Sequence, residues 1–415
     1  MPALHSVYAP RSGEVARRCA YDSTPTTSLH WDEDAESVFG IRGSASAGRG
    51  PGHWVRPHVS DASIWGCDVD GRVQMQVLPS MSAQKEIPTT GSRSQLAQSI
   101  SEFLKDHPDL HLGGEGDFHA ERQHHEQVFS IHNVPKDKVN SIGDVEFTAL
   151  RGPHGTIPVR VLYPKSGEDK KKNGQAAGLI YFHGGGYTVG SVDEFENGLR
   201  LLAEESGAQV YGIDYRLAPE HRFPTQLDEY NALIDWLQGD GGKARGVHPD
   251  RVLGGGDSAG GNMTAAITLR RMDEKKKPLA AQILLYPEAR IPFDTPAAEE
   301  NNSGYYLECN GIFSFADHYL PRGTPPSHRY ISPGIQSIDK LKGLPPAGVY
   351  TSGFDPLGDV GVEYASKLRK AGNEVEWRHY DNMTHGWLQM TAWSEIAARA
   401  VKDVAKDVRK WGYAT

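Results

Sequence analysis

Short apolar runs alternate with longer amphipathic segments from about position 145 to the C-terminus. The short runs are rich in Val, Ile, Leu and Tyr, as in buried strands, and the longer segments repeat apolar residues at helical spacing. This alternation predicts an α/β fold with a mostly parallel central sheet and helices on both faces, in which a leading hairpin supplies an antiparallel edge. The predicted strands are 145–150, 157–163, 179–182, 209–214, 252–255, 282–286, 349–353 and 375–380, and the predicted helices are 196–206, 225–237, the segment after Gly260, 311–319, 360–370 and 394–411.

The pattern is different before this region. Residues 1–91 are rich in Ser, Gly, Pro, Arg and Asp and show no sustained apolar period, which predicts a mostly disordered N-terminal extension. From Ser92 onward, apolar residues recur at helical spacing, so a first helix is expected there. These residues are Leu96, Ile100, Phe103 and Leu104.

Composition narrows the function classes. The 415 residues are 38% hydrophobic with a formal net charge of −9, so the chain can bury a core but offers no basic face for nucleic acid. No apolar run reaches the roughly 18 residues of a membrane span, which argues against stable membrane insertion, and the first twenty positions lack the apolar centre of a signal peptide. Three scattered cysteines suit a reducing compartment. A cytoplasmic location is therefore expected.

The segment Gly256-Asp257-Ser258-Ala259-Gly260 lies between a predicted strand and a predicted helix. A Gly-x-Ser-x-Gly in that setting is typical of a nucleophile elbow, in which a strained turn presents the serine hydroxyl above the sheet. We therefore predict that Ser258 is a catalytic nucleophile.

A serine nucleophile also needs donors for the oxyanion that forms on its substrate. The predicted strand 179–182 runs directly into His183-Gly184-Gly185-Gly186, whose glycines leave backbone N–H groups unobstructed. The predicted donors are the amides of Gly184, Gly185 and Ala259, with His183, Gly186 and Asp257 as supporting motif residues.

The remaining catalytic groups follow in chain order. Asp355 comes after the strand 349–353, and His385 comes after the strand 375–380. The order Ser, Asp, His is the one expected of an α/β-hydrolase triad, with the histidine as general base and the aspartate orienting it. Asp359 is a rival acid but is expected to begin the next helix, and His379 is a rival base but lies within a strand.

These motifs resemble the hormone-sensitive-lipase-like family of α/β-hydrolases, in the branch that carries Gly-Asp-Ser-Ala-Gly. The resemblance implies an α/β-hydrolase fold, esterase activity on short- to medium-chain acyl esters, no cofactor, and a helical cap. The cap would comprise residues 92–140 and about 289–326, within a catalytic domain of residues 141–415. The matching segments are 183–186, 214–220, 256–262, 355–357 and 385–386; Gly358, Val360 and Glu288 depart from the usual pattern.

Two residues are candidates for a substrate pocket. Tyr187 follows the glycine loop and could equally line the pocket or pack in the core, and Glu288 could form one charged boundary. Apolar side chains in the two cap segments predict an apolar, bounded pocket over Ser258. The side chains expected there are Leu96, Phe103, Leu104, Phe118, Phe129, Phe293, Tyr305, Tyr306, Phe313 and Phe315.

A histidine-rich segment spans residues 106–126. Zinc binding by His111, His119 and His125 is conceivable, but no cysteine or His-Glu-x-x-His motif accompanies them, so a solvated cap segment without metal is predicted. The charged runs 168–172 and 273–277 are predicted to be solvated turns.

Three function classes fit the motifs. The first is a serine carboxylesterase acting on a small-molecule ester. The second is an arylformamidase or deacetylase-type amidase on the same triad, since esters and activated amides pass through similar tetrahedral intermediates. The third, a non-catalytic small-molecule binder, is disfavoured because His385 is present beside Ser258 and Asp355. A homodimer is left open.

Overall fold

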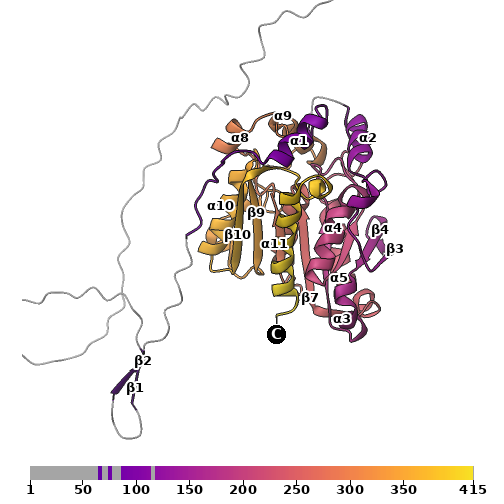
Figure 1. Cartoon of the computed structure of the whole chain (residues 1–415). Helices are drawn as coiled ribbons and strands as arrows, with labels where there is room; N and C mark the ends of the chain where they lie inside the picture. The colour runs from indigo at the N-terminus through magenta and orange to yellow at the C-terminus, as the bar shows by residue number, and fades with distance from the viewer. Residues whose placement is uncertain (1–63, 68–72, 77–85, 114–116, 415) are drawn as a thin grey trace, which may run out of the picture. The chain divides into compact units, whose positions relative to one another are not determined.

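The computed structural model describes residues 64–67, 73–76, 86–113 and 117–414. The chain divides into two compact units, Met1–Ser80 and Met81–Thr415. The larger unit is built on an eight-stranded sheet in the order β10-β9-β8-β7-β5-β6-β4-β3, seen edge to edge in Figure 1. Its strands are β3 (Asp144–Gly152), β4 (Gly155–Tyr163), β5 (Ala176–Phe182), β6 (Gln209–Ile213), β7 (Val247–Asp257), β8 (Gln282–Leu285), β9 (Ala347–Phe354) and β10 (Val375–Thr384).

Six strands, from β10 to β6, run parallel, and the hairpin β3–β4 adds the antiparallel edge. Every residue of β5 and of β9 is buried, and β5 accordingly is a continuous apolar run, whereas β9 also includes the buried polar residues Thr351 and Ser352. The mostly parallel sheet predicted from the sequence is confirmed.

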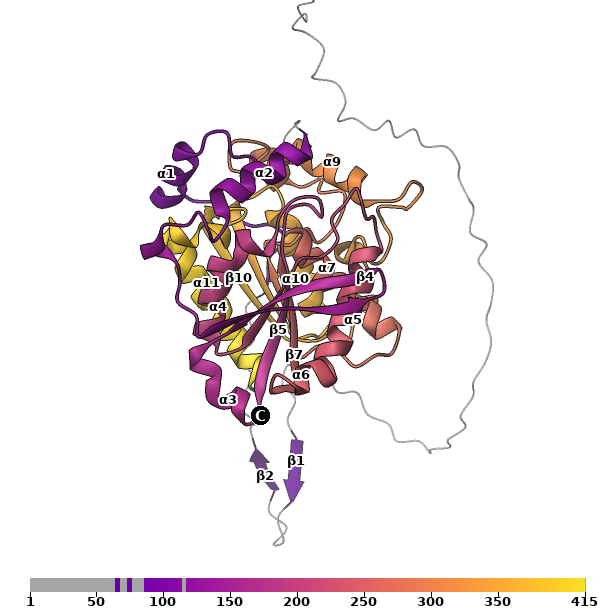
Figure 2. The same ribbon diagram turned by 90° about the vertical axis from the view of Figure 1, so that its right-hand side faces the viewer.

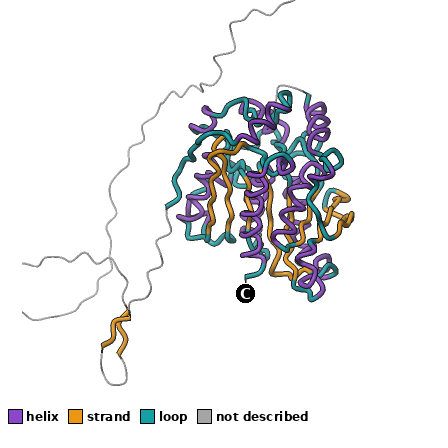
Figure 3. The backbone as a smooth tube through the Cα atoms, viewed as in Figure 1, coloured by secondary structure: helices purple, strands orange, loops and turns teal. Residues whose placement is uncertain are grey.

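Helices cover both faces of this sheet. Figure 2 shows α4 and α11 on one side and α5, α7 and α10 on the other, and Figure 3 separates the two helical layers from the strands by colour. None of the described helices is long and apolar enough to cross a membrane. The covering helices are α4 (Val192–Ser206), α5 (Thr225–Gln238), α7 (Ala259–Asp273), α10 (Gly358–Lys370) and α11 (Glu395–Gly412); shorter helices are α6 (Asp240–Lys243) and the 3₁₀ turns Lys136–Lys138, Lys165–Gly167, Pro333–Ile335, Ile338–Leu341 and Gln389–Ala392.

The two predicted cap segments lie side by side at the end of the sheet where the parallel strands terminate (Figures 1 and 2). The first contributes α1 (Gln98–Asp106) and α2 (Phe118–Phe129), and the second contributes α8 (Pro296–Glu300) and α9 (Cys309–Tyr319). They are joined by a backbone bridge between Leu112 and Leu307.

Two elements differ from the sequence-based expectation. Residues 118–126 of the histidine-rich segment lie in helix α2, whose buried residues are His125 and Phe129, and the charged run Glu168–Lys172 forms the short helix α3 rather than a turn. Helix α2 has few apolar residues, so its sequence carries little 3.6-residue periodicity. Its start is instead marked by Asp117, whose side chain accepts a hydrogen bond from the His119 amide.

The N-terminal boundary also differs. Within the smaller unit, β1 (Ile64–Cys67) pairs with β2 (Val73–Gln76), a hairpin that the sequence did not predict; most of the predicted extension lies outside the described residues. Residues 86–91 belong to the larger unit. Ile87 is buried and its carbonyl accepts a hydrogen bond from Ser366, so the boundary predicted at residue 91 is too late.

Truncation tests this boundary. A chain beginning at Met81 is expected to keep the melting temperature of the full chain, because the preceding residues form a separate unit. A chain beginning at Ser92 loses the buried Ile87, which contributes about 1.5–3 kcal/mol. Its melting temperature, followed by circular dichroism, should fall by at least a few degrees, at about 2–4 °C per kcal/mol. Equal melting temperatures for the two shortened chains would contradict this.

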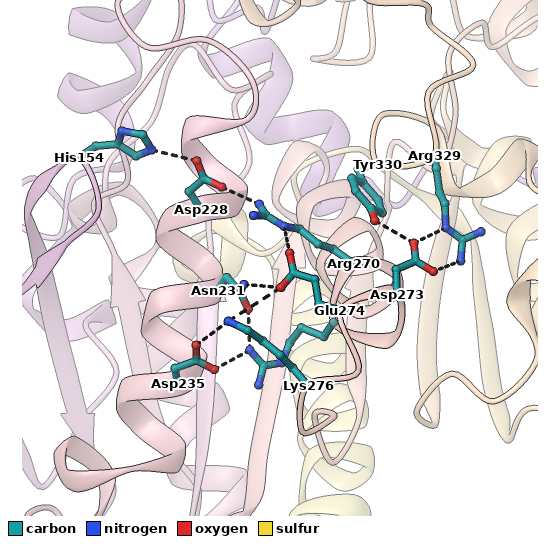
Figure 4. A network of polar contacts seen from close by, with 11 residues as sticks. His154, Asp228, Asn231, Asp235, Arg270, Asp273, Glu274, Lys276, Arg329 and Tyr330 are labelled. Carbon is teal, nitrogen blue, oxygen red and sulfur yellow. Dashed lines mark hydrogen bonds and ion pairs between the residues drawn. The ribbon is translucent and has the colours of Figure 1, made fainter.

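Ion pairs and hydrogen bonds connect α7, the helix that follows Ser258, to the neighbouring helix α5. In α7, Arg270 pairs with Asp228 of α5, and the buried Arg271 pairs with Asp235 of the same helix. Asp273 at the end of α7 accepts two hydrogen bonds from Arg329 (Figure 4). These contacts hold α7 against α5 and against the loop that carries Arg329.

Candidate active site

Ser258 occupies a strained turn between β7 and α7. Its φ of 53° and ψ of −120° are a rare combination for a residue other than glycine. The flanking glycines permit the turn: a Cβ on Gly256 would lie 2.4 Å from the backbone of Gly260, and a Cβ on Gly260 would lie 1.9 Å from the carbonyl oxygen of Phe182. The sequence thus folds into a sharp strand-to-helix turn that places the buried Ser258 in the lining of a pocket.

Asp355 and His385 meet at the carboxyl ends of neighbouring strands β9 and β10. His385 Nδ1 lies 2.9 Å from Asp355 Oδ2, and the other oxygen of Asp355 accepts a hydrogen bond from the Leu357 amide at 2.8 Å. Both side chains are buried. His385 Nε2 is buried without a hydrogen-bond partner, so this nitrogen is available to accept a proton.

Ser258 and His385 line the same narrow pocket, whose cavity volume is about 10 Å³. One side of this pocket is polar, which differs from the apolar pocket predicted from the sequence. Of the cap residues predicted to line it, Tyr306 does so, whereas Phe103 stacks on Phe129 within the cap and Phe313 is largely exposed. Its other walls include Leu112, Val189, Phe195, His125, Glu194 and Gln389.

The rival acid and base lie elsewhere. Asp359 stands in the first turn of α10, where its two oxygens accept hydrogen bonds from the amides of Gly91 and Ala297. His379 lies within β10 with Nδ1 2.9 Å from the Thr351 hydroxyl. Both side chains are therefore engaged in holding segments together.

One predicted oxyanion donor is already occupied. The Gly184 amide donates to Asp257 Oδ1 at 2.9 Å, so it cannot also face a substrate oxygen, and its assignment as a donor is wrong. The amides of Gly185, Gly186 and Ala259 make no hydrogen bond within the described part of the chain. Gly185 lines the pocket, and Ala259 is the first residue of α7, whose N–H groups have no partner inside the helix.

Asp257 fixes the glycine loop to the elbow. Besides Gly184, its Oδ1 accepts a hydrogen bond from the Tyr181 hydroxyl at 3.0 Å. Complete burial raises the pKa of Asp257 to about 7, which these donors partly oppose. His183 is buried between Phe195 and Tyr215, and burial lowers its pKa, so it is a neutral packing residue under the loop.

Tyr187 and Glu288 lie together, but neither lines the pocket shared by Ser258 and His385. Tyr187 stacks on Tyr319 with ring centroids 3.7 Å apart. The buried Glu288 is joined to the elbow through its backbone, whose amide donates to the Ser258 carbonyl. Burial raises the pKa of Glu288 to about 7, and the nearby Tyr187 hydroxyl lowers it in part. The core-packing alternative for Tyr187 thus describes its contacts best.

The structure does not bring His111, His119 and His125 together as a set of metal ligands. Among the residues that the structure describes, no group of three or more His, Cys, Asp or Glu side chains is placed to hold a metal ion. His125 is buried in α2, contrary to the expected solvated segment, with Nε2 3.0 Å from the His111 carbonyl.

A family model described as alpha/beta hydrolase fold matches residues 179–389, just over half of the chain. The chain belongs to this family. The match covers the glycine loop, the elbow, Asp355 and His385, so the resemblance inferred from the motifs is confirmed.

Individual relatives agree with this placement. The carboxylic ester hydrolase LipN of Mycobacterium tuberculosis is 34% identical over 284 residues, covering 67% of this chain and 72% of LipN. Arylacetamide deacetylase of Bos taurus is 31% identical, covering 56% of this chain and 72% of the deacetylase. A hyperthermophilic esterase from the archaeon Pyrobaculum calidifontis matches with a TM-score of 0.69 at 28% identity, covering 76% of this chain and 99% of that protein.

Proposed function

We propose that the protein is a serine carboxylesterase that hydrolyses short- to medium-chain acyl esters through an acyl-enzyme. The observation that carries this function is the pairing of His385 Nδ1 with Asp355, which leaves Nε2 unpartnered in the pocket that also holds Ser258. The similarity to carboxylic ester hydrolases supports the same activity.

Acylation begins when Ser258 Oγ attacks the ester carbonyl carbon while His385 Nε2 takes the hydroxyl proton. The imidazolium that forms is stabilised by Asp355, which also keeps the proton on Nδ1. The carbonyl oxygen becomes an oxyanion that the amides of Gly185, Gly186 and Ala259 receive. When the tetrahedral intermediate collapses, His385 returns its proton to the departing alcohol.

Deacylation repeats these steps with water. His385 removes a proton from a water molecule, whose oxygen attacks the acyl carbon held on Ser258. The second intermediate uses the same three amides, and its collapse releases the carboxylic acid and restores the serine hydroxyl. Each step needs only groups of this chain and water.

An amidase activity is the second candidate, favoured by the similarity to arylacetamide deacetylase. The same oxyanion donors and base would serve an activated amide. A panel of nitrophenyl esters run beside formyl- and acetyl-arylamines compares the two activities. A kcat/KM higher for the arylamides than for the esters would replace the esterase assignment with the amidase one.

Acyl-chain length provides a further prediction. Each added methylene contributes up to ~0.8 kcal/mol until the pocket wall is met. We expect kcat/KM on nitrophenyl esters to peak between about four and eight carbons and to fall steeply beyond about ten, without interfacial activation on triglyceride emulsions. Rates that keep climbing through twelve and sixteen carbons would identify a true lipase instead.

A cytoplasmic location accompanies this proposal. It is supported by the three scattered cysteines, which suit a reducing compartment. The proposed partner is a small-molecule ester, and neither nucleic acid nor stable membrane insertion is needed for the reaction.

A further inference from the structure

The pocket beside Ser258 has a polar wall that the reaction mechanism does not use. Glu194 of α4 lines this pocket together with Ser258 and His385, and only 4% of its surface is exposed. One carboxyl oxygen, Oε2, is buried without a hydrogen-bond partner. A buried polar atom left in this state destabilises the fold, so its retention beside a nucleophile calls for an explanation.

A helix cap does not explain Glu194. The sequence Ser191-Val192-Asp193-Glu194 has the form of a capping box, in which the serine and the glutamate each bond the other's backbone amide. The structure does not use that arrangement, because the Ser191 side chain makes no capping hydrogen bond. At the start of this helix, the Val192 amide donates a hydrogen bond to Asp214 Oδ1 at 2.8 Å.

The surroundings of Glu194 favour the protonated form of its carboxyl group. The Ser191 hydroxyl lies 3.0 Å from Glu126 Oε2 and 3.3 Å from Glu194 Oε1, so two carboxyl groups compete for one serine proton. Burial, followed by the negative charge of Glu126, raises the pKa of Glu194 well above its ordinary value. Asp193 and Asp214 add to this rise, whereas the bond from Ser191 opposes it.

Two other polar groups of this wall, His125 and Gln389, are uncharged. His125 Nε2 bonds the His111 carbonyl, and burial lowers the pKa of His125 to about 4, so Nδ1 is an unprotonated acceptor. Gln389 Oε1 accepts a hydrogen bond from the Tyr306 hydroxyl at 3.1 Å, which leaves the Gln389 amide hydrogens as donors. With the Glu194 carboxyl in its protonated form, Glu194, His125 and Gln389 offer both donors and acceptors without a net charge.

From this arrangement we infer that Glu194 determines specificity by binding a neutral hydroxyl group of the substrate, two or three atoms from the scissile ester. A hydroxyl both donates and accepts, and so it satisfies the Glu194 carboxyl and a second wall group at once. The cavity volume of about 10 Å³ suits a group as small as a hydroxyl. This inference rests on the proposed esterase function and names a substrate class for it: small hydroxyalkyl or hydroxyacyl esters.

Matched substrates that exchange a methyl group for a hydroxyl test the inference. On the alcohol side, 2-hydroxyethyl acetate is compared with propyl acetate, and on the acyl side, ethyl 3-hydroxypropanoate is compared with ethyl butanoate. In the unmodified protein, at least one hydroxyl substrate is expected to have the higher kcat/KM. In Glu194→Leu, the ratio of kcat/KM for the hydroxyl substrate to kcat/KM for its methyl counterpart should fall by about tenfold or more. Glu194→Gln keeps a donor and an acceptor, so it should retain most of this substrate ratio.

Two controls separate substrate binding from a structural role. Glu126→Gln alters the same serine contact but lies outside the pocket lining, so it should keep the substrate ratio. Glu194→Leu should melt no lower than the unmodified protein, because it removes an unpartnered buried oxygen. If the leucine variant does not fold, Glu194→Met replaces it in the same assay.

Several results would overturn the inference. If the kcat/KM ratios of both substrate pairs are unchanged in Glu194→Leu, then Glu194 does not bind the substrate hydroxyl. A preference for acetylcholine over 3,3-dimethylbutyl acetate that is lost in this variant would show an ionised Glu194 that binds cations. If the unmodified protein hydrolyses none of these esters, nor the nitrophenyl esters, the proposed function itself fails and the inference with it.

Discussion

Replacing Ser258 with alanine is expected to lower kcat for ester hydrolysis by on the order of 10⁶ while the protein remains folded. The alanine removes only the hydroxyl at the strained turn, where φ is already 53°. His385→Ala should cost about as much, because a triad acts as a unit and the serine hydroxyl is a weak nucleophile without its base. The rates are measured on a nitrophenyl ester at saturating concentration, with circular dichroism as the folding check.

A matched control keeps this result specific. His379→Ala also removes a histidine from β10, but its ring contacts Thr351 and Ser92 rather than the pocket. It should therefore affect melting temperature more than kcat. Near-normal turnover by a folded Ser258→Ala protein would overturn the nucleophile assignment, and a loss in His379→Ala equal to that in His385→Ala would overturn the choice of base.

Much of the fold follows from local sequence patterns. The limits of the fully buried strands β5 and β9 are predicted to within a few residues, because β5 has no polar residue and β9 has only Thr351 and Ser352. The elbow is equally local, since Gly256 and Gly260 are required by close approaches within the turn and to the neighbouring strand. For the same reason, the positions of Ser258, Asp355 and His385 at strand ends could be predicted from chain order.

Features that depend on distant contacts could not be predicted. The bond from the Gly184 amide to Asp257 spans 73 positions, and nothing near Gly184 indicates that its amide is occupied. The burial of His125 depends on packing against Tyr306 of the second cap segment. Glu194 precedes the helix predicted at 196–206, no catalytic motif marks it, and only the pocket shared with Ser258 distinguishes it. The capping-box spacing offered a local explanation that the fold does not use.

The choice between two acids gives the second large effect. Asp355→Asn should lower kcat by about 10⁴-fold, because an amide at this position can donate to His385 Nδ1 and so favours the wrong tautomer for a base at Nε2. Leu357 still donates to the remaining oxygen, so the loop should keep its conformation. The pH dependence of kcat on the same ester checks that the residual activity comes from an altered base.

Asp359→Asn is the comparison that makes this prediction specific. Its two oxygens accept hydrogen bonds from Gly91 and Ala297, and asparagine can accept only one of them while its amide group faces the other donor. The expected result is a lower melting temperature with less than about a threefold change in kcat, since a lost buried hydrogen bond costs about 1–3 kcal/mol of stability. If Asp359→Asn were as damaging to kcat as Asp355→Asn, then Asp359, and not Asp355, would be the acid that orients His385.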